Sequence, residues 1–146
     1  MIRKAEESDT QAVQRIVAAA YAPLAQRMDK PPAPMLDDYR ARIAEGVVDV
    51  WADAEAVLGV IILVNQPDAL MLENVAVSPE AQGRGVGRDL IRHAETEARA
   101  RGYSRIRLYT HATMTANQAM YAGLGYVETS RGKDEGYHRV QFEKQL

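Results

Sequence analysis

The alternation of apolar and polar residues predicts strands along the whole chain. Four precede residue 80: Ile2 to Ala5, Val47 to Ala52, Ala56 to Val64 and Leu70 to Val77. Three follow residue 100: Arg105 to Thr110, Tyr126 to Ser130 and Tyr137 to Glu143. The second and third strands flank a turn at Asp53-Ala54-Glu55. That pair and the last two strands are each expected to form an antiparallel hairpin.

Apolar residues at helical spacing predict two helices in the first third of the chain. The face of the first helix is Ala12, Val13, Ile16, Val17 and Ala20. Before it, Ser8-x-x-Gln11 has the pattern of a capping box. The segment from Tyr21 to Pro34 contains three closely spaced prolines, which exclude a regular helix. A second helix is expected from about Leu36 to Glu45, ended by Gly46.

Two more helices are predicted in the second half of the chain. The apolar face of the longer one, which ends near Gly102, is Val86, Leu90, Ile91, Ala94 and Ala98. The shorter one begins at a second capping-box pattern, Thr115-x-x-Gln118, and runs to about Leu124, with Gly125 as its stop. The resulting order is β-α-α-β-β-β-α-β-α-β-β, which predicts an α/β (α+β) fold, a mixed sheet with helices on both faces.

The composition is that of one ordinary globular domain. The chain has 146 residues, of which 47% are hydrophobic and 26% charged, and a formal net charge of −2, which suits a single domain over residues 1–146. Nothing in the sequence supports binding to nucleic acid or to a membrane, because there is no basic block with interleaved aromatic residues and no apolar run of membrane-spanning length. The first residues lack the apolar core of a secretory signal, so a cytoplasmic location is expected.

The most specific chemical signal is the hexapeptide Gln82-Gly83-Arg84-Gly85-Val86-Gly87, which follows a strand and opens the long helix. N–H groups and the positive end of the helix dipole meet at such a junction, and glycine lets a phosphate approach the backbone. We therefore expect an anion-binding loop. Six residues with three glycines could instead form an ordinary flexible turn.

Two common phosphate-binding fingerprints do not fit this loop. G-x-G-x-x-G would need glycine at Arg88 or Leu90, and G-x-x-x-x-G-K-[ST] counted from Gly83 also fails at Arg88. The pattern Q-x-x-G-x-G fits, with Gln82, Gly85 and Gly87 in the fixed positions. It resembles motif A of the GCN5-related N-acetyltransferases (the GNAT superfamily). The predicted order of elements is also similar to that family over essentially the whole chain.

The resemblance implies a GNAT-like, mostly antiparallel sheet of about seven strands and an enzyme that uses acetyl-coenzyme A, without a metal. The expected coenzyme-binding residues are the backbone of Val75, Ala76 and Val77, the loop residues Gln82, Gly83, Arg84, Gly85, Val86 and Gly87, and Arg88 and Asn117. Arg84 and Arg88 could pair with the coenzyme phosphates or simply keep the loop soluble. The family commonly has its asparagine seven residues before the catalytic tyrosine, where this chain has Met114. Asn117 could bind the pantetheine arm, orient Tyr121 or satisfy local backbone groups.

Tyr121 is the expected general acid. It stands four residues before Gly125-Tyr126 and so resembles the family tyrosine that faces the thioester sulfur. A phenol stays protonated at neutral pH and can donate its proton to the departing thiolate. The alternative is a tyrosine packed in the core. The chain has no cysteine, which fits direct attack of a primary amine on the thioester, without a thiolate carrier; a serine could take the place of that carrier.

The general base is left open among several groups. Glu73 is the first choice, because an isolated glutamate in an apolar strand needs a partner or an open cleft. Glu73 could also be a solvent-facing residue on the alternate side of its strand. His111 is the competitor, since a histidine pKa suits a base, and His138 is a weaker candidate. Bulk water is a further alternative.

The acceptor is expected to be a small-molecule or amino-acid-like primary amine. The segment from Tyr21 to Tyr39, including Met28, is apolar and aromatic and corresponds to the helix pair that borders the acceptor in the family, and His111 is a further expected contact. A homodimer is common in the family. Alternatives are a longer acyl donor, decided by pocket depth near Met71, Met114 and Met120, and a non-catalytic acyl-coenzyme A sensor of the same fold.

Overall fold

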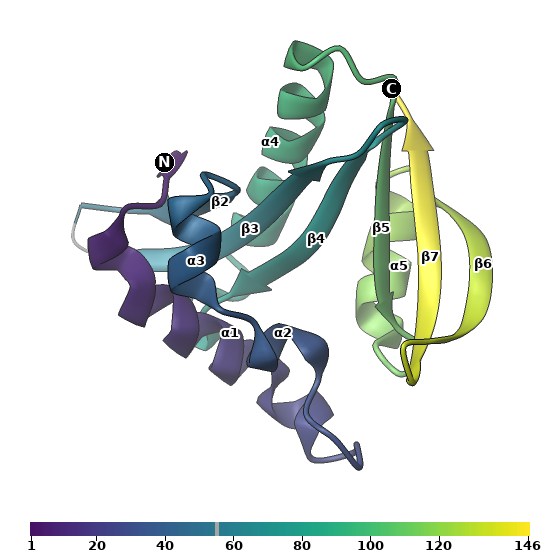
Figure 1. Ribbon diagram of the computed structural model, residues 1–146, viewed down its shortest axis with the longest axis horizontal. Coiled ribbons are helices and arrows are strands. Elements are labelled where there is room, and N and C mark those ends of the chain that lie inside the picture. Colours follow the sequence, from purple (N-terminus) through teal and green to yellow (C-terminus); the bar gives the residue numbers. More distant parts are fainter. Residues whose placement is uncertain (55) are drawn as a thin grey trace. The chain divides into compact units, whose positions relative to one another are not determined.

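The computed structural model describes residues 1–54 and 56–146 and forms a seven-stranded sheet in the order β1-β2-β3-β4-β5-β7-β6 (Figure 1). The strands are β1 Ile2–Lys4, β2 Val48–Ala52, β3 Val57–Asn65, β4 Leu70–Val77, β5 Arg105–His111, β6 Val127–Asp134 and β7 Tyr137–Gln145. The helices are α1 Thr10–Ala25, α2 Ala33–Leu36, α3 Tyr39–Ala44, α4 Val86–Ala100 and α5 Thr115–Gly123, with 3₁₀ turns η1 Glu7–Asp9 and η2 Pro79–Ala81. The β4–β5 pair is parallel, whereas β1–β2, β2–β3, β5–β7 and β6–β7 are antiparallel. The predicted mixed, mostly antiparallel sheet is thus confirmed.

The chain forms two compact units. The first comprises residues 1–63 and 74–94, and the second comprises residues 64–73 and 95–146. Strand β4 and helix α4 each contribute residues to both units.

In the first unit, helices cover both faces of β4. Asn74 in β4 forms hydrogen bonds with Tyr21 of α1 and Tyr39 of α3. Val77, three residues further along the strand, instead faces α4, because a Cβ placed on Gly87 would lie 3.6 Å from its Cγ2 atom. Successive side chains of a strand alternate between its faces, so Asn74 and Val77 point to opposite sides. The helices α1 and α3 therefore pack on one face and α4 on the other.

Helix α4 packs closely on β3 because the strand has a glycine at the contact. A Cβ at Gly59 would lie 2.7 Å from Val86 Cγ1 and 2.9 Å from Leu90 Cδ1, closer than side chains can approach without a shift. The predicted apolar face of α4 is confirmed: Val86, Leu90, Ile91, Ala94 and Ala98 are each at most 1% exposed. The close approach fixes the start of α4, and hence the glycine loop before it, against the sheet.

In the second unit, β7 pairs antiparallel with β5 on one side and with β6 on the other, and α5 packs on these strands. Tyr121 of α5 contacts the rings of Tyr126 and Phe142, with centroid distances of 6.0 Å in both pairs. Tyr126 also donates a hydrogen bond to Glu95, which accepts a second one from Lys144. This aromatic group holds α5 on one face of these strands.

Both predicted capping boxes are wrong. Ser8 lies inside η1, and the reciprocal hydrogen bonds join Glu6 and Asp9 instead. Arg3 pairs with Asp9 at 2.7 Å, which holds that carboxylate where it accepts the Glu6 N–H. In α5 the N-cap residue is Met114, and the Gln118 side chain donates to the carbonyls of His111 and Ala112. At the start of η1, the salt bridge from Arg3 of β1 determines which carboxylate completes the capping box. At the start of α5, the carbonyls of the preceding turn bind the Gln118 side chain, which therefore does not cap the helix.

The bounds of three other elements also differ from the prediction. Helix α1 continues to Ala25 and includes Pro23, because a proline in the last turn removes only one helical hydrogen bond. The expected helix from Leu36 to Glu45 is shorter, since Asp38 caps the Ala41 N–H and α3 begins at Tyr39. Helix α2, Ala33–Leu36, begins inside the segment from Tyr21 to Pro34 that was predicted to be irregular. The final hairpin is longer than expected at both strands. Glu55 in the predicted first turn lies outside the described residues.

Candidate functional site

The glycine loop has the backbone of an anion-binding nest. Gly83 and Gly85 have φ values of +83° and +82°, a left-handed conformation that other residues rarely adopt. A Cβ at either glycine would meet no atom within 4 Å, so the loop is open to solvent on that side. Successive N–H groups in such a turn point toward one region of space.

Five N–H groups of this loop and of the first turn of α4 have no hydrogen-bond acceptor among the residues that the structure describes. They belong to Gly83, Gly85, Val86, Gly87 and Arg88. The first N–H groups of any helix lack a partner within the helix, and here the preceding loop adds two more. The donor set and the helix dipole fit a pyrophosphate, whose oxygens accept several hydrogen bonds. The exposed side chains of Arg84 and Arg88 add positive charge nearby.

The other expected contacts of the first unit lie on β4 and on the helices. Val75 and Val77 are half-buried and Ala76 is buried in β4, which leads directly into η2 and the loop. Tyr21 lies on α1 and Tyr39 on α3. Met28 is half-buried in the irregular segment that follows α1.

Asn74 is a polar residue that the sequence analysis missed. It is 6% exposed, accepts a hydrogen bond from the Tyr21 hydroxyl at 2.8 Å and donates one to the Tyr39 oxygen at 3.2 Å. Tyr39 in turn donates to the carbonyl of Pro34. The amide thus connects both predicted acceptor tyrosines to β4. Its signal in the sequence was an asparagine within the apolar run Leu70 to Val77.

Tyr121, Asn117, His111 and Glu73 lie in the second unit. Tyr121 is 3% exposed, and burial raises the pKa of its hydroxyl, so the phenol remains protonated throughout the physiological range. Among residues 1–54 and 56–146, no group forms a hydrogen bond with this hydroxyl, and it is not one of the fully enclosed polar atoms. The group can therefore donate its proton outward.

Asn117 and His111 are both engaged locally. Asn117 Nδ2 contacts Met114 Sδ at 3.9 Å, and the Thr113 N–H donates to His111 Nδ1 at 3.1 Å. Partial burial and the nearby charges of His138 and Arg139 lower the pKa of His111, which favours its neutral form. His138 is exposed on β7 opposite Lys133.

Glu73 is half-buried and directly follows the parallel pairing of β4 with β5, which covers Leu70–Leu72 and 106–108. The next residue on β5 in this register is Tyr109. Burial raises the pKa of Tyr109, Arg139 lowers it, and the charge of Glu73 raises it again. Glu73 and Tyr109 thus each lie one position beyond the last paired residues of β4 and β5.

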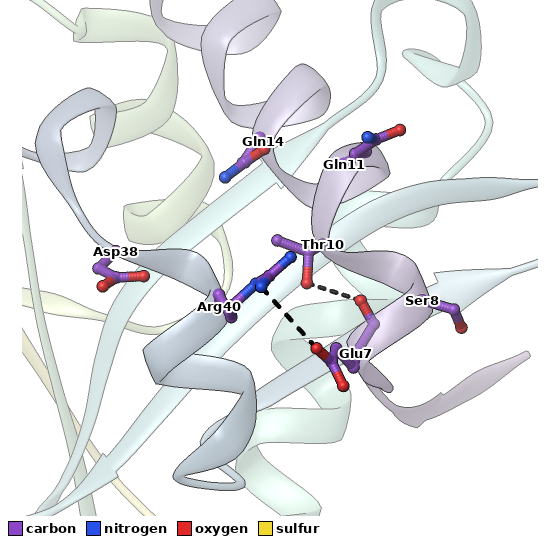
Figure 2. A pocket seen from close by; sticks show the side chains of 7 residues that line it. All are labelled: Glu7, Ser8, Thr10, Gln11, Gln14, Asp38 and Arg40. Carbon is purple, nitrogen blue, oxygen red and sulfur yellow. Dashed lines mark hydrogen bonds and ion pairs between the residues drawn. The ribbon is translucent and has the colours of Figure 1, made fainter.

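A polar hollow of about 530 Å³ lies elsewhere in the first unit, at the amino-terminal ends of α1 and α3. Figure 2 shows its lining side chains, which are Glu7, Ser8, Thr10, Gln11, Gln14, Asp38 and Arg40. Arg40 reaches Glu7 at 4.0 Å, and both side chains are exposed. None of the predicted site residues lines this hollow.

Asp49 and His93 have side chains of the type that binds metals, but their contacts indicate a structural role. The Asp49 carboxylate, on β2, contacts His93 Nε2 of α4 at 2.7 Å and Lys4 Nζ of β1 at 3.2 Å. The lysine already neutralises this buried carboxylate, so the pair needs no cation. The cluster ties α4 to the first two strands.

Comparison with known proteins places these features in a family context. A model described as the acetyltransferase (GNAT) family matches residues 11–126. N-alpha-acetyltransferase 80 of Mus musculus is 42% identical over 64 residues, 44% of this chain and 19% of that protein. The ribosomal protein bS18-alanine N-acetyltransferase of Salmonella typhimurium is 38% identical over 63 residues, 43% of either chain. The chain thus spans less than half the length of these curated relatives.

A solved structure matches over the whole length. The PaiA N-acetyltransferase of Thermoplasma acidophilum, in complex with coenzyme A, aligns with a TM-score of 0.81 and 16% identity, over 100% of this chain and 98% of that one. At 16% sequence identity, this structural similarity shows that the two proteins share a fold. No helix in the described part of the chain is long and apolar enough to cross a membrane.

Proposed function

Because the chain belongs to the acetyltransferase (GNAT) family, we propose that it is an N-acetyltransferase that moves an acetyl group from acetyl-coenzyme A to a primary amine. The observation that carries this proposal is the set of five N–H groups at the loop and the first turn of α4, which have no acceptor within residues 1–54 and 56–146. The neighbour with coenzyme A bound and the two curated N-acetyltransferases support it.

In this proposal the Gln82–Gly87 loop binds the coenzyme pyrophosphate and Arg84 and Arg88 pair with its phosphates. The backbone of Val75, Ala76 and Val77 binds the pantetheine amides and the developing oxyanion, and Asn117 assists with the pantetheine arm. The bound thioester supplies the acetyl group. The protein then has to hold the amine in line with the carbonyl carbon, which removes much of the entropic barrier.

The remaining steps are the removal of a proton from the amine and the delivery of a proton to the departing thiolate. An amine with a pKa of about 10.4 is only about 0.1% neutral at pH 7.4, which costs roughly 4 kcal/mol. We assign the removal of this proton to Glu73, directly or through water, with His111 as the competing base. Tyr121 donates its proton to the sulfur as the carbon–sulfur bond breaks, and the second proton that the attacking nitrogen loses on becoming an amide restores the phenol. Burial raises the pKa of the phenol, so it stays protonated at neutral pH, but the same shift makes it a weaker acid toward the thiolate.

The acceptor is proposed to be a small or amino-acid-like amine bordered by Tyr21, Met28, Tyr39 and His111. A second acceptor class is the α-amine of a protein amino terminus, which the names of both curated relatives favour. Amino acids and protein amino termini both have the amine on the carbon atom next to a carbonyl group, and they differ in whether that group is a free carboxylate.

The test is calorimetric titration of acetyl-coenzyme A, followed by an assay of thiol release. The acceptor panel contains simple amines, amino acids and short peptides with free amino termini. Micromolar binding with thiol release on one class supports the proposal and identifies the acceptor. Binding without release on any member would favour a sensor. Absence of binding would contradict the assignment of the glycine loop.

A further inference from the structure

The second unit contains a largely buried arginine that the reaction described above does not use. The Arg139 side chain, on β7, is 8% exposed. Its guanidinium lies 4.2 Å from the centre of the Tyr109 ring and 5.3 Å from that of Tyr137. Two aromatic rings therefore fix the plane of the guanidinium before any ligand arrives.

The charge of Arg139 is balanced from the turn between β6 and β7. Its Nη1 atom lies 3.0 Å from Asp134 Oδ2 and 3.6 Å from Glu135 Oε2, and both acidic side chains are largely exposed. Glu135 and Gly136 have φ values of 52° and 81°, as in the tight turns that fit hairpins. The turn thus holds both carboxylates at one end of the guanidinium.

The other edge of the guanidinium is unused. In the described part of the chain, neither Nε nor Nη2 of Arg139 forms a hydrogen bond or an ion pair. Neither atom is fully enclosed, since the only buried side-chain nitrogen or oxygen without a partner among the described residues is Arg105 Nε. Nε and Nη2 together form the two-pronged edge that matches the spacing of carboxylate oxygens.

We propose that Arg139 binds a carboxylate of the acceptor through its Nε and Nη2 atoms. This inference rests on the proposed function, and it specifies the substrate class as amines that carry a carboxylate. Arg139 is then a specificity-determining residue that takes no part in bond making.

The surroundings of Arg139 match such a zwitterionic acceptor. His111 lies opposite Arg139 in the β5–β7 register. Tyr109, whose ring contacts the guanidinium, and Glu73 each lie one position beyond the last paired residues of β5 and β4. A carboxylate at Arg139 would point its amine along the same side of these strands toward the proposed base. Asp134 and Glu135, at the Nη1 end of the guanidinium, would repel an anion of higher charge, such as a phosphate, more strongly than a single carboxylate.

The inference is tested with matched acceptors, each amino acid being compared with its carboxamide. The wild-type protein is expected to prefer the free acid by about tenfold or more in kcat/KM. Arg139→Lys keeps the positive charge and loses the two-pronged edge of Nε and Nη2. Its KM for the acid should therefore rise about tenfold, while its kcat and its KM for the amide remain unchanged. Arg131→Lys, on the exposed strand β6, is the matched control and should retain the preference.

Either of two outcomes would overturn the inference while leaving the proposed function intact. The first is equal turnover of acid and amide by the wild type, and the second is an unchanged preference for the acid in Arg139→Lys. A purely structural role would lower activity on both acceptors together. If no amine is acetylated, the proposed function fails, and nuclear magnetic resonance still decides the role of Arg139. Its Nε–H signal, assigned by its absence from Arg139→Lys, should shift with acetate and not with acetamide. A signal that moves with neither would refute the site.

Discussion

At the scale of single residues, Gly85 tests the anion nest most directly. Its φ of +82° and the open space beside it mean that Gly85→Glu adds a carboxylate where the pyrophosphate is proposed to bind. We expect the affinity for acetyl-coenzyme A to fall at least about 100-fold, since the substitution replaces attraction with repulsion. Calorimetry measures this, and so does fluorescence of the sole tryptophan, Trp51, which donates to Asp89 in the first turn of α4 at 3.3 Å.

Gly46 provides the control for this substitution. Gly46 has a similar φ of +78° and also has nothing within 4 Å of an added Cβ. Gly46→Glu therefore introduces the same backbone strain and charge away from the loop. It should lose stability to the same extent as Gly85→Glu, about 1 kcal/mol, and still bind the coenzyme. Equal loss of binding in both variants would mean that strain, and not the loop, is responsible.

Tyr121 provides the second test at this scale. Tyr121→Phe retains the ring contacts with Tyr126 and Phe142 and removes only the hydroxyl, so the fold and the affinity for the donor should persist. We expect kcat to fall by about 10² to 10⁴. Because burial raises the pKa of the phenol, the wild-type rate should show no basic decline from this group up to pH 10. A decline near pH 10 that disappears in Tyr121→Phe would contradict the raised pKa.

At the scale of elements, local patterns in the sequence predicted the strands and α4, whereas tertiary contacts decided the caps and the buried polar groups. The face from Val86 to Ala98 could be read from spacing alone, because it repeats over four turns. The cap at Asp9 could not, because Arg3 on β1 selects it. The same holds for Asn74, whose two tyrosine partners lie 53 and 35 residues away. The unused edge of Arg139 likewise depends on strands that are distant in sequence.

The contact of Asp49 with Lys4 and His93 links β1, β2 and α4, and it makes stability depend on pH. Burial alone would raise the pKa of Asp49, but the hydrogen bond with His93 and the charge of Lys4 lower it overall. The stabilisation is therefore present above the unfolded pKa of about 3.9 and is lost as the pH falls through the lower folded pKa. Asp49→Asn should reduce the free energy of unfolding by about 1 to 3 kcal/mol at pH 7.

Urea denaturation at several pH values checks this expectation. The difference between wild type and Asp49→Asn should shrink as the pH is lowered from about 5 to about 3. Asp29→Asn, at an exposed position in the irregular segment after α1, should match the wild type at every pH. A difference that stays constant with pH would show that shape, and not charge, accounts for the effect of Asp49.

At the scale of the whole molecule, the shared elements predict that the two compact units unfold together. Strand β4 and helix α4 each supply residues to both units, so unfolding of one unit removes part of an element from the other. Calorimetry should show one cooperative transition. Acetyl-coenzyme A at 100 times its dissociation constant should add about 2.7 kcal/mol and raise that single midpoint by about 8 °C. Gly85→Glu should reduce this shift to about 1 °C or less, and Gly46→Glu should retain it. Two transitions, with only one raised by the coenzyme, would show that the units unfold independently and that only one of them binds the ligand.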